Sequence, residues 1–384
     1  MLNRGKAQEP LVDISIDVIK RNQHPSGAYV ASPCFPNYAY CWLRDGTYTA
    51  NAMDRFGEHE SARAYFLWVN RTIAANRSRL ERAVRAGSSV QRSELANALP
   101  ARWTLDGGRD ETDWPSFQLD GYGTWLWGLA EHVVRTGDAV LLEELHEGIR
   151  LTLEYLRLAW RLPNYSCWEE HGDQVHTSTL ACLAGGIGRI ARLIGDPSAE
   201  ALAAEIRGYL LECGIVDGRL SKFCRQQGPG PQIIAPGGGV RAGRDIGDSV
   251  DASLLWVTVP FGLLGPFDPR MLRTVEEVER TLVRDYGVHR YPADTYYGGG
   301  LWLLLSAWLG WYYCEAGRLA EARSCLAWVE AQADADGLMP EQVDTHLIDP
   351  GYRQPWIERW GPVAKPLLWS HAMYLILRSE LDRH

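Results

Sequence analysis

The chain has 384 residues, 46% of them hydrophobic and 23% charged, which is the ordinary balance of a globular protein with a sizeable core. Its net charge of −9 argues against a nucleic-acid partner, because such a partner favours a clustered basic surface. It has no apolar run long enough to span a bilayer and no apolar secretory leader, so we expect no membrane segment and a cytoplasmic location.

Helical periodicity dominates the chain, with little of the alternation typical of strands. Asp196-Pro197 and Asp268-Pro269 are typical helix starts, because aspartate caps a helix and proline suits its first turn. Short turns place neighbouring helices antiparallel. About twelve helices in six consecutive hairpins predict an all-α fold, the (α/α)6 barrel, as a single domain over residues 1–384. The predicted helices are 10–22, 44–56, 58–85, 118–136, 138–160, 176–195, 197–213, 250–261, 269–285, 300–316, 318–334 and 366–381.

One loop, at 225–244, is rich in glycine and proline and has too few apolar residues for a core. A loop of this length inside a compact fold is either a mobile lid near a site or a surface loop, and we favour the lid. A ring of hairpins collects its interhelix loops at one end. Residues far apart in the sequence are therefore expected to converge there.

The strongest chemical signal is a pair of carboxylates beside a tryptophan, Trp168-Glu169-Glu170, followed much later by Glu341 after a proline. Sugar hydrolysis needs one carboxyl to protonate a glycosidic oxygen and a second to deprotonate water. Two adjacent carboxylates cannot share one environment, so one of them can stay protonated while the other is ionised. The alternative is that Glu169 and Glu170 are ordinary surface acids before a helix.

Four further segments carry polar and aromatic residues at hairpin ends. Vicinal sugar hydroxyls need donors next to an acceptor, which adjacent arginine and aspartate supply. Tryptophan and tyrosine stack on sugar faces and also donate a hydrogen bond. Taken singly, each segment also fits a helix cap, a salt bridge or helix packing. The candidate binding residues are Trp42, Arg44, Asp45, Trp114, Arg290, Tyr296, Tyr297 and Trp369.

Metal and cofactor sites are not expected. The eight cysteines lack CxxC spacing and indicate buried thiols rather than disulfides or a zinc site. His171 and His176 do not have HExxH spacing, and the glycine run at 298–300 is not a phosphate-binding fingerprint.

These motifs together resemble glycoside hydrolase family 15, the glucoamylase family, over residues 30–380. The resemblance is carried by Trp42-Leu43-Arg44-Asp45, Trp114 with Gln118-Leu119-Asp120-Gly121, Trp168-Glu169-Glu170, the segment 290–299, Pro340-Glu341-Gln342 and Trp369-Ser370-His371-Ala372. It implies the (α/α)6 barrel.

The resemblance also implies roles for individual residues. Glu169 would be the general acid and Glu341 the general base, acting with inversion. Arg44 and Asp45 would bind the terminal glucose, and Glu170 and Arg290 would hold the same ring or the next. Trp114 would stack nearby, and Trp42, Trp168, Tyr296, Tyr297 and Trp369 would complete the substrate site.

Some features depart from the larger members of that family. About 30 residues precede the first motif, so we expect neither an N-terminal β-sandwich nor a starch-binding module beside the catalytic domain. The expected activity is an exo-acting α-glucosidase on short α-gluco-oligosaccharides. Compact bacterial members that cleave α-1,6 linkages, as in isomaltose, are the nearest type. The expected state is a monomer or a homodimer.

Three alternatives remain at this point. The same carboxylates would serve an α,α-trehalase. A non-catalytic barrel that senses glucosides, like that of the phosphorylase-kinase regulatory subunits, would keep the fold without turnover. A polysaccharide lyase with an unrelated (α/α)6 barrel is poorly matched, because an acidic chain offers few basic subsites for uronate polymers.

Overall fold

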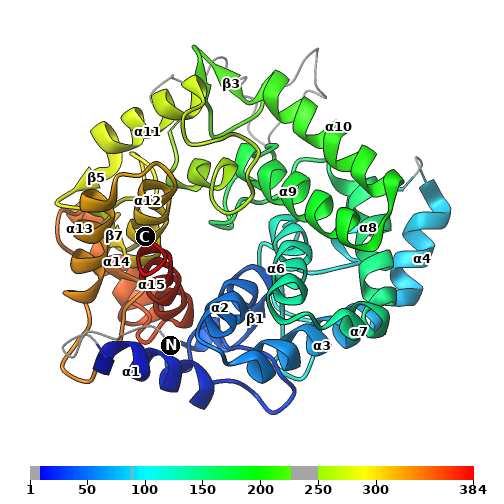
Figure 1. The fold of residues 1–384 in the computed structure, drawn as a ribbon, viewed down its shortest axis with the longest axis horizontal. Helices are drawn as coiled ribbons and strands as arrows, with labels where there is room; N and C mark the ends of the chain where they lie inside the picture. Colours follow the sequence, from blue (N-terminus) through cyan, green and yellow to red (C-terminus); the bar gives the residue numbers. More distant parts are fainter. Residues whose placement is uncertain (1–8, 88–89, 226–249) are drawn as a thin grey trace.

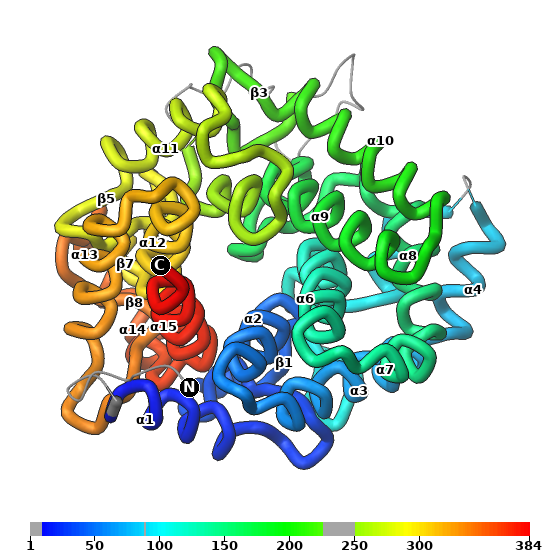
Figure 2. The backbone as a smooth tube through the Cα atoms, viewed as in Figure 1, coloured from blue at the N-terminus to red at the C-terminus, as the bar shows by residue number. Residues whose placement is uncertain are grey.

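The computed structural model describes residues 9–87, 90–225 and 250–384. Six inner helices form a closed ring in which each packs against the next, and six outer helices surround them (Figures 1 and 2). Outer and inner helices alternate along the chain, so the predicted (α/α)6 barrel is confirmed. The inner ring is α2 (Leu43–Arg55), α6 (Asp120–Thr136), α9 (Thr177–Ile194), the 3-10 helix η4 (Ala252–Val257), α12 (Leu303–Glu315) and α15 (Leu368–Leu381). The outer ring is α1 (Glu9–Arg21), α3 (His59–Ala75), α8 (His146–Ala159), α10 (Pro197–Cys213), α11 (Pro269–Leu282) and α13 (Leu319–Glu330).

Short elements occupy the connections. The helical ones are η1 (Pro36–Tyr38), α4 (Arg77–Ala86), α5 (Arg92–Ala96), α7 (Ala139–Glu144), η5 (Tyr296–Gly298), η6 (Pro350–Tyr352) and α14 (Arg353–Trp360). The described residues form three small antiparallel sheets. Two have two strands each, β1 (Cys41–Trp42) with β2 (Arg102–Trp103) and β3 (Ile215–Val216) with β4 (Arg219–Leu220). The third has four strands in the spatial order β5 (Val283–Arg284), β6 (Gly287–Val288), β7 (Leu301–Trp302) and β8 (Gln342–Val343).

Three of the predicted helices differ from the structure. The segment 58–85 divides at Asn76. The Asn76 side chain donates to the Thr72 carbonyl, which the Asn76 backbone amide would bond in a continuous helix, and that amide donates to the Ile73 carbonyl instead. The segment 138–160 divides at Leu145. The segment 250–261 contains only the short 3-10 helix η4, which begins after the cap Asp251. A longer helix cannot continue through Pro260, because proline lacks a backbone donor and disfavours helical geometry in the residue before it. The candidate lid at 225–244 lies outside the described residues from 226 onward.

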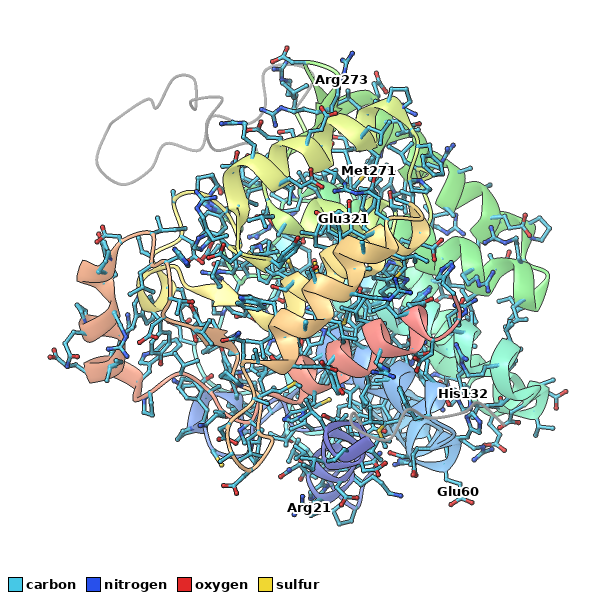
Figure 3. All side chains as sticks on the ribbon, turned by 60° about the vertical axis from the view of Figure 1, so that its left-hand side comes forward. Arg21, Glu60, His132, Met271, Arg273 and Glu321 are labelled. Carbon is cyan, nitrogen blue, oxygen red and sulfur yellow. The ribbon has the colours of Figure 1, made fainter. Side chains whose placement is uncertain are left out.

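The outer helices present charge to the periphery. Figure 3 shows Arg21, Glu60 and Arg273, on α1, α3 and α11, at the edge of the molecule. The predicted caps are also present: the Asp196 side chain accepts from two backbone amides of α10, and Asp268 accepts from the first turn of α11. The two caps satisfy backbone amides that have no partner within α10 and α11.

Aromatic side chains fill the axis of the ring. Tyr48 of α2 is fully buried and its ring lies within 6.2 Å, centroid to centroid, of four other rings. These belong to Trp127, Trp256, Trp308 and Trp369, from four other inner elements. Each such side chain buries a large apolar area. The barrel is therefore a packed core below its loops.

Helices α6 and α9 pack backbone against backbone at two glycines. A Cβ added to Gly123 of α6 would lie 2.6 Å from the Cys182 carbonyl oxygen of α9. A Cβ added to Gly186 of α9 would collide with the backbone of Gly123 in turn. The two backbones are in contact, so neither can yield without moving a helix.

We therefore expect Gly123→Ala to lower the free energy of unfolding by about 1–3 kcal/mol, the usual cost of overpacking. Gly208→Ala on α10 is the matched control, because nothing lies within 4 Å of its added Cβ. Alanine there is expected to stabilise the helix by about 0.5–1 kcal/mol. Denaturant unfolding of both variants measures the difference. Equal stabilities would show that the α6–α9 contact is not tight.

Candidate active site

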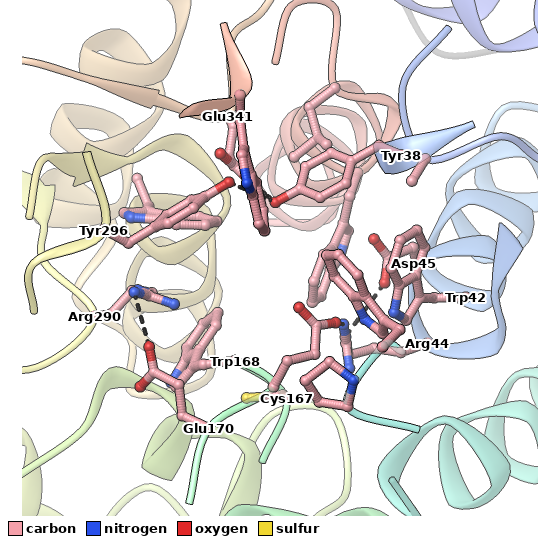
Figure 4. A pocket seen from close by; sticks show the side chains of 18 of the residues that line it. Tyr38, Trp42, Arg44, Asp45, Cys167, Trp168, Glu170, Arg290, Tyr296 and Glu341 are labelled. Carbon is pink, nitrogen blue, oxygen red and sulfur yellow. Dashed lines mark hydrogen bonds and ion pairs between the residues drawn. The ribbon is translucent and has the colours of Figure 1, made fainter. Parts of the chain in front are cut away.

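A cavity of about 370 Å³ opens at the end of the barrel where the inner helices begin. Figure 4 shows its walls: Glu341 with Tyr38 and Tyr296, Arg44 with Asp45, and Arg290 with Glu170. Every predicted site residue except Tyr297 lines the cavity. The predicted residues in the lining are Trp42, Arg44, Asp45, Trp114, Trp168, Glu169, Glu170, Arg290, Tyr296, Glu341 and Trp369.

Arg44, in the first turn of α2, connects four parts of the ring. Its guanidinium donates to the Asp120 carboxylate at 2.8 Å and to the Gln118 side chain at 3.2 Å, at the start of α6. It also lies 3.6 Å from a Glu169 oxygen and 5.1 Å from the centroid of the Trp369 ring. Arg44 is 4% exposed, so these contacts form away from water and are strong.

Asp45 follows Arg44 on α2 and lies 3.2 Å from its Nε. Burial raises the pKa of Asp45 to about 7, against the opposing charge of Arg44. The Asp45 carboxylate oxygen Oδ2 is ion-paired with Arg44 but accepts no hydrogen bond among the described residues. The pair thus places an acceptor beside a fork of donors, as vicinal hydroxyls require.

Glu169 lies on the loop before α9, with a left-handed φ of +61°. Its amide donates to the Ser166 carbonyl, and the Glu170 carbonyl accepts from the Ser166 amide, so the loop folds back on itself. Burial raises the pKa of Glu169 above its ordinary value of 4.5, against the opposing charge of Arg44. This environment favours a carboxyl that keeps its proton.

Glu341 lies on the loop before α15 and is 2% exposed. One carboxylate oxygen accepts from the Tyr38 hydroxyl at 2.9 Å, and Tyr38 is in turn 2.8 Å from the Tyr296 hydroxyl. Burial raises the pKa of Glu341 to about 8, although the Tyr38 hydrogen bond and the Arg290 charge favour the ionised form. Its other oxygen has no hydrogen-bond partner among the described residues and is the one left to accept a proton.

The first turn of α15 holds the Glu341 loop in place. The Met339 amide donates to His371 Nε2 at 3.1 Å, and the Ser370 hydroxyl donates to the Pro340 carbonyl at 2.8 Å. An acceptor role for Nε2 requires neutral His371, and burial lowers the pKa of His371 to about 3. The sequence motif 369–372 therefore contributes Trp369 to the cavity lining. Its Ser370 and His371 hold the loop that carries Glu341 by hydrogen bonds to the backbone of Pro340 and Met339.

Arg290 and Glu170 form the third wall. Arg290 makes two hydrogen bonds to Asp294, at 2.7 and 2.5 Å, and one to Glu170 at 3.3 Å. The second Glu170 oxygen accepts from Tyr291. Asp294 and Tyr291 thus fix the two sides of the Arg290–Glu170 ion pair. The adjacent acids Glu169 and Glu170 have different partners, Arg44 for the first and Arg290 for the second.

Trp168 is anchored through its indole nitrogen, which lies 3.1 Å from both oxygens of buried Asp251. Asp251 also accepts from Ser253 at the start of η4 and pairs with buried Lys222 at 3.1 Å. The residue before Glu169 is therefore attached to the inner ring by a charge-assisted hydrogen bond.

The remaining predicted residue, Tyr297, does not line the cavity. Its left-handed φ of +51° turns the side chain away, and its hydroxyl donates to the Gly361 carbonyl at 2.9 Å. Several lining residues were not among the candidates. Trp302 ends the glycine-rich segment, Tyr38 begins the Tyr-rich motif before α2, and α14 contributes Trp356, Arg359 and Trp360, whose aromatic pair has helical spacing.

Three other properties follow from the described part of the chain. Within it, no group of three or more His, Cys, Asp or Glu side chains is placed to hold a metal ion. Its helices are all too short or too polar to cross a membrane. All eight cysteines are free, and Cys34 is the exposed one.

The chain is similar to proteins of known activity. It is 42% identical over 375 residues to the isomaltose glucohydrolase of Kribbella flavida, an alignment that covers 95% of this chain and 90% of that protein. A glycosidase variant solved in complex with glucose superposes with a TM-score of 0.86 at 41% identity, covering 97% of this chain and 96% of that one. A trehalase of Mycolicibacterium smegmatis is 26% identical over 78% of this chain and 46% of that protein.

The family model "Glycosyl hydrolases family 15" matches residues 5–335. That range includes the inner helices α2 to α12 and the Trp168-Glu169-Glu170 loop. The alignment with the Kribbella enzyme extends the similarity over nearly the whole chain. The chain therefore belongs to glycosyl hydrolases family 15.

Proposed function

We propose that this protein is an exo-acting, inverting α-glucosidase that releases glucose from the non-reducing end of short α-gluco-oligosaccharides, with isomaltose as the model substrate. The observation that carries the proposal is that Glu169 and Glu341, from loops before two different inner helices, line one cavity together with the Arg44–Asp45 pair. The high identity to an isomaltose glucohydrolase supports the α-1,6 linkage. The described residues act as a single catalytic barrel.

The mechanism follows from the two carboxyl environments. Glu169 donates its proton to the glycosidic oxygen as the bond to the anomeric carbon breaks. Glu341 takes a proton from water, whose oxygen attacks that carbon from the opposite face. Arg44 and Asp45 hold the terminal glucose by its hydroxyls. The ionised Glu341 and the surrounding dipoles stabilise the cationic transition state.

Exo action follows from the closed inner end of the cavity. Trp369 and Trp168 line it, and behind them Trp308 and Tyr48 fill the ring axis. Among the described residues no opening continues through the packed aromatic core, so a sugar chain enters this cavity by its end. This geometry favours release of one terminal glucose at a time.

The alternatives have less support. The trehalase relative is far less similar than the isomaltose glucohydrolase. A non-catalytic sensor would have no need for two carboxyls with raised pKa values that face one cavity, because such shifts are typical of catalytic sites. Both alternatives predict that isomaltose is not cleaved.

Replacing either catalytic carboxyl is expected to abolish turnover while leaving binding nearly intact. Glu169→Gln and Glu341→Gln should each lower kcat by about 10²–10⁴-fold, the usual contribution of general acid–base catalysis. Glucose release from isomaltose gives kcat, and calorimetry gives the affinity. Glu60→Gln, on the surface of α3, is the control. Turnover like that of the wild type in either variant would remove that residue from the mechanism.

The stereochemistry of the product tests inversion. Direct attack by water on isomaltose should release the terminal unit as β-glucose, while the departing glucose keeps its own mixture of anomers. The β anomer should therefore first exceed its equilibrium share, and mutarotation then removes the excess. Proton NMR during the first minutes of isomaltose hydrolysis distinguishes the anomers. An initial excess of α-glucose over its equilibrium share would indicate a covalent intermediate and would assign Glu341 a nucleophilic role.

The pH dependence of kcat/KM is expected to be bell-shaped, with both limbs above the ordinary glutamate pKa of 4.5. As pH falls, Glu341 gains a proton and no longer accepts one from water. As pH rises, Glu169 loses the proton it must donate. Because burial raises both pKa values, that of Glu341 to about 8, the maximum should lie between 4.5 and 8. A maximum below 4.5 would contradict these environments.

A further inference from the structure

Helix α14 lies at the mouth of the cavity and has no fully buried residue. Trp356 and Trp360 are four residues apart, so they share one face of the helix, and both line the cavity. Gln354 and Glu358 bond to each other on the exposed side. Helix α14 therefore forms a wall of the cavity. It presents two half-buried indoles to the cavity and its polar face to solvent.

The two indoles continue an aromatic wall from residues deeper in the site. Trp356 lies 5.0 Å, centroid to centroid, from Tyr296, which contacts the Tyr38–Glu341 pair. Trp360 lies 5.9 Å from Trp114. Rings from α14 therefore join the Tyr296 side of the cavity to the Trp114 side along the mouth.

Other residues fix the position of this wall. The Tyr297 ring stacks on Trp356 at 6.1 Å and 28°, and its hydroxyl donates to the Gly361 carbonyl at the end of α14. At the start of the segment, the Asp349 amide donates to the Gly298 carbonyl at 3.0 Å. The left-handed backbone of Tyr297 is what directs its side chain toward α14 instead of the cavity. The indoles are thus held by groups on η5.

Arg359 supplies polar contacts beside the indoles. It is exposed, lines the cavity, and its guanidinium lies 5.7 Å from the Trp356 ring and 5.3 Å from the Trp360 ring. The pairing of an aromatic face with a fork of donors suits a sugar ring, whose C–H face stacks while its hydroxyls accept hydrogen bonds.

The order of residues along the cavity indicates which sugar of the substrate α14 would bind. Trp369 packs against Tyr48 and Trp308 of the aromatic core, and the Arg44–Asp45 pair lies beside it, so these residues mark the inner end of the cavity. Helix α14, which has no fully buried residue, lies at the outer end. We propose that Trp356, Arg359 and Trp360 of α14 form the binding site for the departing sugar, on the far side of the scissile bond. The inference rests on the proposed function for its assignment of the inner end to the terminal glucose. It identifies the substrates as α-glucosides whose leaving group is a sugar ring.

A substrate without a leaving sugar tests the proposal. α-Glucosyl fluoride fills only the inner site, because fluoride departs in place of a sugar. Trp360→Ala and Arg359→Ala should each lower kcat/KM for isomaltose, by about tenfold for the tryptophan, which is the loss of one good stacking contact. Both variants should keep wild-type kcat/KM for α-glucosyl fluoride. Trp360→Phe, which retains a ring, should recover most of the isomaltose activity.

Tyr352→Ala is the matched control, since Tyr352 lies just before α14, is 47% exposed and does not line the cavity. It should leave both activities unchanged. Equal losses on the two substrates in the α14 variants, or no loss on either, would overturn the proposal. Arg359→Ala removes an exposed side chain, so it tests the site even if Trp360→Ala fails to fold. A wild-type protein that cleaves neither substrate would instead contradict the proposed function.

Discussion

The active-site end of this barrel depends on one buried cation. Arg44 belongs to α2, yet its guanidinium contacts Asp120 on α6, Glu169 on the loop before α9 and the Trp369 ring on α15. Removing a buried arginine would leave Asp120 as an uncompensated buried charge, which costs far more than a surface ion pair. The Arg44 side chain that positions Glu169 therefore also holds the inner helices α2, α6 and α15 together. Stability and catalysis are coupled at this residue.

The direction of the inner helices explains why the chemistry gathers at one end. Hairpins that alternate outer and inner helices make all inner helices begin on the same side, so every connecting loop before them lies there. The positive ends of these helices favour nearby carboxylates in their ionised form. Burial acts in the opposite sense and prevails at Glu169 and Glu341, because both pKa values are raised.

The sequence predicted most of the ring because helix periodicity and helix caps are local properties. It was wrong where a local interruption overrides periodicity. Asn76 redirects its side chain to the backbone, and Pro260 stops the helix predicted over 250–261. Eleven of the twelve predicted site residues line the cavity because their motifs occur at hairpin ends. Tyr38 was missed as a site residue, since its partner Glu341 is 303 residues away and no local pattern records that contact.

The case of Tyr297 and α14 shows what the sequence could not separate. Tyr296 and Tyr297 are neighbours in one motif, and only backbone geometry assigns the first to the cavity and the second to the support of α14. The left-handed conformation of Tyr297 is uncommon for a bulky residue, and it persists only where the surroundings determine it. Here the Gly361 hydrogen bond and the Trp356 ring do so. Tyr297 thus links Tyr296, which lies beside the Tyr38–Glu341 pair, to α14 at the mouth. The single segment η5 therefore positions side chains at both ends of the cavity.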